Sequence, residues 1–529
     1  MNRLRRATIV ASFGYMQYAP AIASGILMVP LTLRCLGTRT YGLWLASGEV
    51  LAYAAMVDLG VIGVLPWMLA EADGHGDRAA MRRLVANGLV VGAVVGVIYG
   101  LLAALLWLLL PATLTLSAAD RAVVARPLAL LVMAMMVAYP LRVFSAVLAG
   151  LQDATFNGWL AVTQSLLSIS LSATLLVRGF GVDALAIGSA AATLVAVFAA
   201  IARTRVVAPD LLRGWPRPSL SIVRMLLTNG LGVWGGAFGW QLVAASNGVV
   251  ITALGRPEWM AVYACTAKLT SIATQLAWVL PDAGLVGLAQ VQGEAPRPER
   301  LRPLVLLMLR LHLLLAGGAA CGLLLFNPVF VRAWVGPELF GGLVLNTLLA
   351  AGIVAAGLVH GVLATASVIG NRVRVGAVTL MQGIVQVGAA WLCGRMWGLP
   401  GIAAAAAVTG LAISLPAGIR LLTPVTGLTL TALRDELLVP WLQRTGWLLL
   451  ACVALAPVLR RASLPSAVAV TVFAGVTYLV ALRPMLASLP ALDAVPVMAR
   501  LSRWLVRVRM FPSAADGAGR PLPSNAGQT

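Results

Sequence analysis

Long apolar runs, separated by short polar or basic breaks, cover most of the 529 residues. A helix that crosses a bilayer needs about 20 predominantly apolar residues, and many of these runs reach that length. We therefore predict an all-α polytopic membrane protein with about fourteen transmembrane helices. The predicted spans are 8–35, 41–69, 84–110, 127–149, 156–177, 182–202, 222–254, 259–288, 303–326, 340–369, 375–394, 399–419, 441–459 and 464–486.

A basic, proline-containing stretch at 203–221 divides the chain, with six predicted spans before it and eight after it. A weak repeat relates the two sides, because Leu36-Gly37 recurs as Leu254-Gly255 at an offset of 218 residues in the same inferred orientation. Such a parallel repeat predicts two six-helix lobes. The predicted units are an N-terminal lobe (1–202), a cytoplasmic linker (203–221), a C-terminal lobe (222–420), two additional transmembrane helices (421–486) and a cytoplasmic amphipathic and disordered tail (487–529).

Composition agrees with a membrane protein, because only 11% of the residues are charged whereas soluble chains carry about 25%. The formal charge is +20, and Lys268 is the only lysine among 38 basic residues. Here the arginines flank apolar runs, which favours topology signals and contacts with membrane lipids over a nucleic-acid partner. With the N-terminus inside, 25 arginines fall in inside segments and 10 in outside segments. We therefore expect both termini to be cytoplasmic.

Few ionisable residues interrupt the predicted spans. Such groups are costly in a bilayer unless they face a wet cavity or a partner, so they are candidates for function. Arg310 could instead reach the cytoplasmic surface, and His312 is expected to be a packing residue. The candidate substrate-binding or cavity residues are Lys268, Arg142, Glu49, Asp58, Asp282 and His360.

Each candidate also has a structural interpretation. Asp282 follows Pro281 and could cap a broken helix end, and Asp58 could bond a neighbouring helix. Arg142 could snorkel to the surface, and His360 could be a packing residue.

The repeat offset carries position 49 to 267, one residue from Lys268. We therefore expect the Glu49 carboxylate and the Lys268 amine to approach each other across the cavity. Pairing would offset a penalty of about 2.5–3.5 kcal/mol per charge in the membrane. The alternative is that Lys268 snorkels outward and Glu49 bonds a neighbouring helix.

Enzyme and metal-binding motifs are absent from the sequence. It contains no GxxxxGK[ST] loop and no HExxH, and its three histidines are far apart. Its five cysteines form no CxxC pattern, which opposes a disulfide framework or metal site. The sequence therefore predicts a transporter without cofactor or metal, rather than an enzyme.

Several N-terminal motifs are familiar. Val29 to Gly37 (VPLTLRCLG), Tyr41 to Trp44 (YGLW) and Val57 to Gly60 (VDLG), with Ala70-Glu71 and Gly76-Asp77, lie within residues 8–85. This region resembles lipid-linked oligosaccharide (Wzx-type) polysaccharide flippases of the multidrug/oligosaccharidyl-lipid/polysaccharide exporter superfamily. A looser match follows from Val262 to Pro281.

The resemblance implies two six-helix lobes around a central cavity, two extra C-terminal helices and rocking-type alternating access. It also implies export of undecaprenyl-pyrophosphate-linked glycans across a bacterial inner membrane for O-antigen, lipopolysaccharide or exopolysaccharide synthesis. On this interpretation the diphosphate meets Lys268 and Arg142, and a coupling ion, H⁺ or Na⁺, acts through Glu49 or Asp58. The sequence departs from the family in these two acids, because such flippases tend towards cationic cavities.

Three alternatives remain open. A cation-coupled multidrug or organic-cation antiporter of the same superfamily needs acids on the first and seventh spans, and 8–33 and 222–254 contain none. A membrane ligase or polymerase of polysaccharide assembly is opposed by the short outside loops. A structural scaffold for an export complex predicts that removing the cavity charges has no effect.

Overall fold

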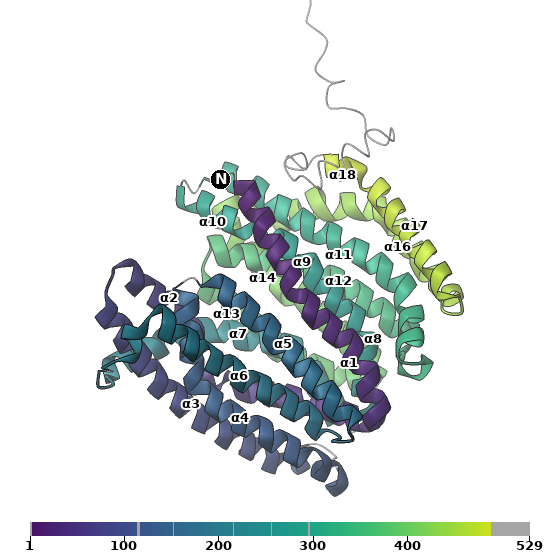
Figure 1. Ribbon diagram of the computed structural model, residues 1–529. Coiled ribbons are helices and arrows are strands. Elements are labelled where there is room, and N and C mark those ends of the chain that lie inside the picture. Colours follow the sequence, from purple (N-terminus) through teal and green to yellow (C-terminus); the bar gives the residue numbers. More distant parts are fainter. Residues whose placement is uncertain are drawn as a thin grey trace, which may run out of the picture.

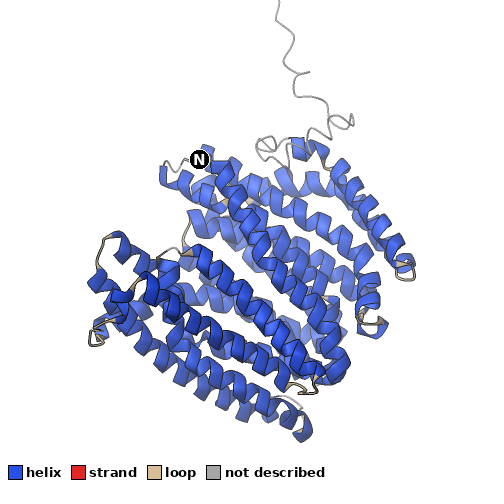
Figure 2. Ribbon diagram, in the orientation of Figure 1, coloured by secondary structure: helices blue, strands red, loops and turns tan. Residues whose placement is uncertain are grey.

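The computed structural model describes residues 3–113, 117–151, 153–214, 216–254, 257–294 and 297–487. Every regular element in these ranges is a helix, as Figure 2 shows. The chain is therefore an all-helical membrane protein, as its apolar runs predict. The predicted amphipathic and disordered tail lies, apart from Ala487, outside the described residues.

The N-terminal part of the chain runs as far as a short 3₁₀ turn. Its elements are α1 (Arg3–Ala54), the 3₁₀ turn η1 (Ala55–Asp58), α2 (Val61–Gly74), α3 (Arg78–Thr113), α4 (Ala118–Gly150), α5 (Ala154–Val177), α6 (Asp183–Val207) and η2 (Pro209–Leu212).

The remaining elements include two single-turn π-helices, η4 and η5. They are α7 (Leu220–Ala253), α8 (Pro257–Thr266), α9 (Lys268–Ala283), α10 (Leu285–Glu294), α11 (Pro298–Trp334), η3 (Pro337–Leu339), α12 (Gly342–Ile369), α13 (Arg372–Thr409), η4 (Gly410–Ser414), α14 (Leu415–Thr426), α15 (Leu430–Leu433), η5 (Arg434–Leu438), α16 (Val439–Leu459), α17 (Leu464–Ala481) and α18 (Arg483–Ala487).

Two of the longest helices are each two helices joined at a glycine. In α1 the junction is Gly37, with φ 75°, and in α13 it is Gly398, with φ 65°. Glycine adopts this left-handed region without the steric penalty that a Cβ brings. The Gly37 junction lies between the first two predicted spans, where the sequence predicts a turn.

Nine stretches of the described helices are long and apolar enough to cross a membrane, or up to ten if the bent pair Gly25–Asp58 and Val61–Gly74 is one span. This is fewer than the fourteen expected. Part of the difference is that 372–426 forms one continuous stretch across the Gly398 kink. Another part is that the predicted span 259–288 is divided into α8, α9 and α10, each too short to cross alone.

The helices form two groups, which Figure 1 shows as a blue set and a teal-to-yellow set. In the first group α4 packs against α2, α3 and α6, and in the second α11 packs against α9, α12, α16 and α17. The groups have separate apolar cores, one containing Leu65 and Val143 and the other Leu313 and Val362. Helix α1 contacts α5 of the first group and α8 and α9 of the second, and α7 contacts α2 and α3 as well as α13.

Candidate functional site

A break between α8 and α9 places Lys268 at the start of a helix. The main-chain carbonyl of Thr266 is freed at this break, and it accepts a hydrogen bond from Asn327 Nδ2 at 2.9 Å. Thr266 Oγ1 accepts a second bond, from the amide of Gly341 at 2.8 Å. Irregular backbone at membrane depth is tolerated only when its polar groups are satisfied in this way. The partners on α11 and before α12 therefore fix where α9 begins.

The Lys268 amine lies against Gly25 of α1, where any side chain would overlap it. Among the described residues, no carboxylate forms an ion pair with this lysine. Glu49 lies elsewhere, with its carboxylate against Gly248 of α7 and its Oε2 buried without a hydrogen bond. The predicted Glu49–Lys268 pair is therefore wrong. The repeat offset aligns positions in sequence, but it does not align the directions of their side chains.

Asp58 lies in the break between α1 and α2, and its Oδ1 accepts a hydrogen bond from the Gly60 amide at 3.1 Å. The carbonyl of Met56 in the same break accepts a bond from Trp234 Nε1 on α7 at 2.6 Å. Asp58 thus stabilises the break through a bond within its own segment, and not through the bond to a neighbouring helix that its structural interpretation predicts. The guanidinium of Arg142 lies 5.8 Å from the ring of Tyr139 and forms no ion pair with Asp58.

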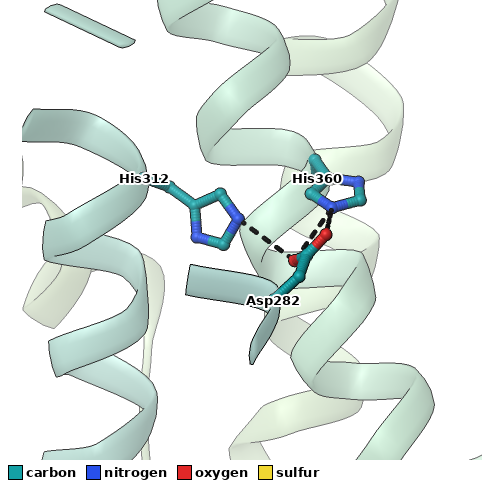
Figure 3. Close-up of side chains that lie close together, drawn as sticks. All are labelled: Asp282, His312 and His360. Carbon is teal, nitrogen blue, oxygen red and sulfur yellow. Dashed lines mark hydrogen bonds and ion pairs between the residues drawn. The ribbon is translucent and has the colours of Figure 1, made fainter. Parts of the chain in front are cut away.

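Asp282 and His360 are the two predicted candidates that the structure brings into contact. Figure 3 shows that Asp282 of α9 lies between His360 of α12 and His312 of α11. His360 Nε2 lies 3.0 and 3.1 Å from the two carboxylate oxygens, and His312 Nε2 lies 3.5 Å from Oδ1. His312 was expected to be a packing residue. Only the tertiary packing of α11 shows that it joins this cluster.

A cavity of about 740 Å³ opens beside the cluster, between α7, α9, α12 and α13. His360 is part of its wall, and the ring of Trp278 stacks on the imidazole with centroids 3.8 Å apart. The walls are mainly apolar and aromatic, with a few polar groups among them. Those polar and aromatic lining residues include Trp67, Trp240, Tyr263, Thr270, Thr274, Trp278, Arg372, Thr379 and Gln382.

The sequence contains a signal for one wall of this cavity. Thr270, Thr274, Trp278 and Asp282 recur at intervals of four residues, which places them along one face of α9. A stripe of hydroxyl, indole and carboxylate groups on a helix in an apolar run indicates a polar-lined cavity. Of these four residues, only Asp282 is among the candidates predicted from the rarity of ionisable groups in the spans.

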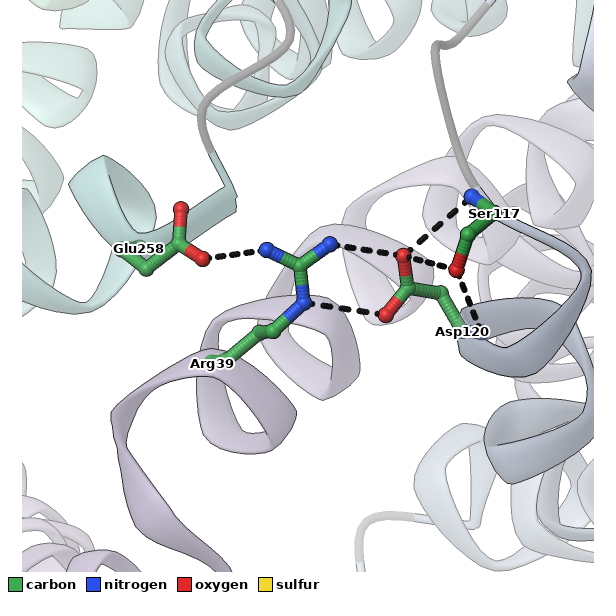
Figure 4. Close-up of polar contacts among 4 residues, drawn as sticks. All are labelled: Arg39, Ser117, Asp120 and Glu258. Atoms are coloured by element: carbon green, nitrogen blue, oxygen red, sulfur yellow. Dashed lines mark hydrogen bonds and ion pairs between the residues drawn. The ribbon is translucent and has the colours of Figure 1, made fainter.

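Arg39 joins the two groups of helices at the end opposite the N-terminus, just beyond the Gly37 kink. Its Nε and Nη2 donate to Asp120 of α4 at 3.0 and 2.8 Å, and its Nη1 donates to Glu258 of α8 (Figure 4). Asp120 is held in turn by a reciprocal capping contact with Ser117. The same two helices, α1 and α8, contribute to a buried apolar cluster that includes Val29, Tyr41, Cys265 and Leu339. The ion pairs of Arg39 therefore join the two groups at this end, in a contact that the sequence did not predict.

No protein-family model matches the chain, and no curated protein matches it. Solved structures do match it in three dimensions. One is the inward-facing conformation of a multidrug resistance MATE family transporter of the MOP superfamily, with a TM-score of 0.59, 18% identity, and coverage of 80% of this chain and 98% of that chain. The chain has a MATE-like fold.

Two further structures agree with this result. A MATE point mutant matches with a TM-score of 0.55, 17% identity, and coverage of 80% of this chain and 96% of that one. A mutant of the Vibrio cholerae MATE transporter VcmN matches with a TM-score of 0.51, 16% identity, and coverage of 82% and 99%. At these identities the likeness concerns the fold, which is that of a multi-pass membrane transporter.

Proposed function

We propose that the chain is a flippase that moves a lipid-linked oligosaccharide from the cytoplasmic to the outer leaflet of a bacterial inner membrane. Its substrate is an undecaprenyl-pyrophosphate-linked glycan for polysaccharide biosynthesis. The position of Lys268 carries the proposal. Its amine lies between α1 and α9, which belong to different halves, without a carboxylate partner among the described residues. A cation in a poorly hydrated site attracts a diphosphate far more strongly than one at a surface.

Other residues have supporting roles in this proposal. Arg142, on α4 of the other half, offers a second cation and forms no ion pair among the described residues. Glu49, whose Oε2 is buried without a hydrogen bond, is the better candidate for a coupling H⁺ or Na⁺, because Asp58 caps a helix break. The aromatic cavity in the second half offers apolar surface to an amphiphilic substrate.

The proposed architecture has fourteen spans in two six-helix lobes, 1–202 and 222–420, followed by two further helices. Helices α1 and α2 together make two of these spans when they are divided at Gly37. The stretch 372–426 makes two more when it is divided at Gly398. The successive helices α8, α9 and α10 make one more, crossing together as a broken span. The helices α3 to α7, α11, α12, α16 and α17 supply the remaining nine.

Contacts between helix ends support the proposed topology, with both termini cytoplasmic. Each joins segments that are predicted to lie on the same side of the membrane. Arg332, predicted outside, donates to the carbonyl of Arg460 in another outside loop at 2.6 Å. Arg203 and Asp153, both predicted inside, form an ion pair at 2.8 Å. If the predicted number of spans between two such contacting residues were wrong by one, the two residues would be assigned to opposite sides of the membrane.

The second candidate is a cation-coupled drug or organic-cation antiporter. It is favoured by the name of the multidrug resistance transporter whose structure the chain resembles. It is opposed by the absence of acidic residues from 8–33 and 222–254, and by the unpaired amine of Lys268 between the halves. A site for organic cations needs an uncompensated carboxylate at that interface rather than an uncompensated ammonium group.

Complementation of a strain that lacks its lipid-linked oligosaccharide flippase tests the proposal. We expect Lys268→Ala to abolish transport while the protein remains inserted in the membrane, and Lys268→Arg to retain part of the activity. The matched control is Arg434→Ala, because Arg434 forms an exposed pair with its neighbour Asp435. Full activity of the Lys268→Ala variant would remove this lysine from the mechanism and, with it, the proposal's main support.

A further inference from the structure

We propose that Asp282, His312 and His360 form a binding site for one divalent transition-metal ion of the Zn²⁺ class. The three residues come from α9, α11 and α12, and one potential ligand atom from each lies within 4.8 Å of the other two. Two imidazole nitrogens and one carboxylate oxygen are the ligands of a common open zinc site. The inference is independent of the flippase proposal, because it concerns binding of the ion itself.

The orientation of the His312 ring supplies the decisive observation. Its Nδ1 lies 2.9 Å from the carbonyl oxygen of Met308, which can only accept, so Nδ1 carries the proton. In the neutral ring Nε2 then has a free lone pair, and it is buried without a hydrogen bond among the described residues. This lone pair faces Asp282 Oδ1 at 3.5 Å, so two acceptors point at each other. A cation removes the repulsion between them, either a metal ion or a second proton on the ring, and a Zn²⁺ titration distinguishes the two.

The distances also suit a metal ion. Ligand atoms bonded to Zn²⁺ at about 2.0–2.2 Å in tetrahedral geometry lie roughly 3.3–3.5 Å apart. Asp282 Oδ1 lies 3.1 Å from His360 Nε2, slightly below that range, and 3.5 Å from His312 Nε2, at its upper end. When the ion binds, the His360 proton resides on Nδ1, and both imidazoles remain neutral ligands.

Contacts of the two imidazoles with neighbouring residues hold them in place, as in established metal sites. The Met308 carbonyl fixes the tautomer of His312, and the Trp278 ring, parallel to the His360 imidazole within 3°, fixes the plane of that ring. A Cβ at Gly361 would lie 2.9 Å from His312 Nδ1, so glycine there lets the ring lie close to α12. The backbone and packing thus orient both imidazoles towards one point.

The site keeps an open position. Asp282 and His360 are partly exposed, with 34% and 23% of their side-chain surfaces accessible, and His360 is part of the cavity wall. His312 is fully buried behind them. Three protein ligands therefore leave a fourth position on the cavity side for water or for an oxygen of a bound molecule.

Purified full-length protein, stripped with a chelator, tests the proposal by titration with Zn²⁺ against a fluorescent competitor. We expect one ion per chain. X-ray absorption of the same sample should show two imidazoles and oxygen ligands at about 2.0–2.2 Å. A sulfur shell, or no binding by the folded wild-type protein, would overturn the proposal. Because neither readout involves transport, the result does not depend on the flippase assay.

Variants assign the ion to these residues. Asp282→Asn, His312→Gln and His360→Gln should each weaken Zn²⁺ binding by about tenfold or more, since even outer-shell changes cost that much. His75→Gln is the matched control, because His75 lies in the segment after α2 and outside the cluster. Unchanged affinity in the three variants, or loss of binding in the control, would place the ion elsewhere and contradict the proposal.

Discussion

The guanidinium of Arg39 contacts a carboxylate from each half of the molecule, Asp120 through two parallel hydrogen bonds and Glu258 through one. The Arg39 side chain is about half exposed, and ion pairs of that kind are worth about 1 kcal/mol or less each. This energy is too small to hold the two halves permanently together at this end. It is enough to bias the equilibrium between a state with this contact and a state without it, because 1 kcal/mol changes a population ratio about fivefold. On the proposed topology and function, Arg39 therefore fits an outer contact that forms and breaks during transport.

Arg39→Ala should weaken this contact and expose Cys265, which is buried on α8 about two turns beyond Glu258. In a variant whose other four cysteines are replaced by alanine, we expect about fivefold faster labelling of Cys265 by an impermeant maleimide added outside. Arg126→Ala is the control, because Arg126 pairs with Asp183 inside the first half at 3.5 Å. Equal labelling rates in wild type and Arg39→Ala would show that these ion pairs do not hold the outer end closed.

At the scale of single residues, the sequence located the rare ionisable groups in the apolar runs but did not predict their partners. Asp282 and His360 were singled out as rare ionisable groups in apolar runs, and they lie in contact. His312 could not be added, because its role depends on how α11 packs beside α9. Glu49 and Lys268 were paired by an offset, and each lies instead against a glycine of another helix.

The break between α1 and α2 depends on a close approach of two helices. Leu59 and Gly60 both adopt positive φ, 49° and 76°, and Gly60 lies against Gly230 of α7. The carbonyls of Ala55 and Met56 accept bonds from side chains on α4 and α7. The break is therefore stabilised by neighbouring helices, which hold the bent span against α7.

Gly60→Ala should destabilise the protein by about 2 kcal/mol or more, because the residue has positive φ. In addition, the new Cβ would lie 2.5 Å from the Gly230 carbonyl oxygen. Gly48→Ala is the matched control, since a Cβ there meets nothing within 4 Å, and replacing glycine in a helix interior gains up to about 1 kcal/mol. Thermal unfolding in detergent measures both. A melting temperature for Gly60→Ala equal to that of Gly48→Ala would contradict this account of the break.

The positions of the helices could be predicted because each apolar run is a local property of the chain. The breaks inside those runs could not. At Ala267 and at Leu59 the helix is interrupted without a strong local signal beyond Gly60, and the freed groups are satisfied by Asn327 and Trp234, far away in sequence. Such breaks depend on tertiary partners. Local hydropathy therefore predicts an unbroken transmembrane helix at these positions.

For the whole molecule, the proposed topology predicts the side of each loop. Reporter fusions after Arg213 should give a cytoplasmic signal, and fusions near Arg121 or Arg332 should give an outside signal. The physical reasons are the uneven distribution of arginines and the same-side contacts of Arg332 with Arg460 and of Arg203 with Asp153. An outside signal after Arg213 would contradict the division into six spans and eight.

The central claim is that this MATE-like fold moves an anionic lipid-linked sugar past Lys268. Purified protein in vesicles, supplied with a labelled undecaprenyl-diphosphate oligosaccharide in one leaflet, tests it most directly. We expect the label to reach the opposite leaflet with wild-type protein and with Arg434→Ala, but not with Lys268→Ala. Ion-driven export of an organic cation, with no movement of the lipid-linked sugar by the wild-type protein, would contradict the claim.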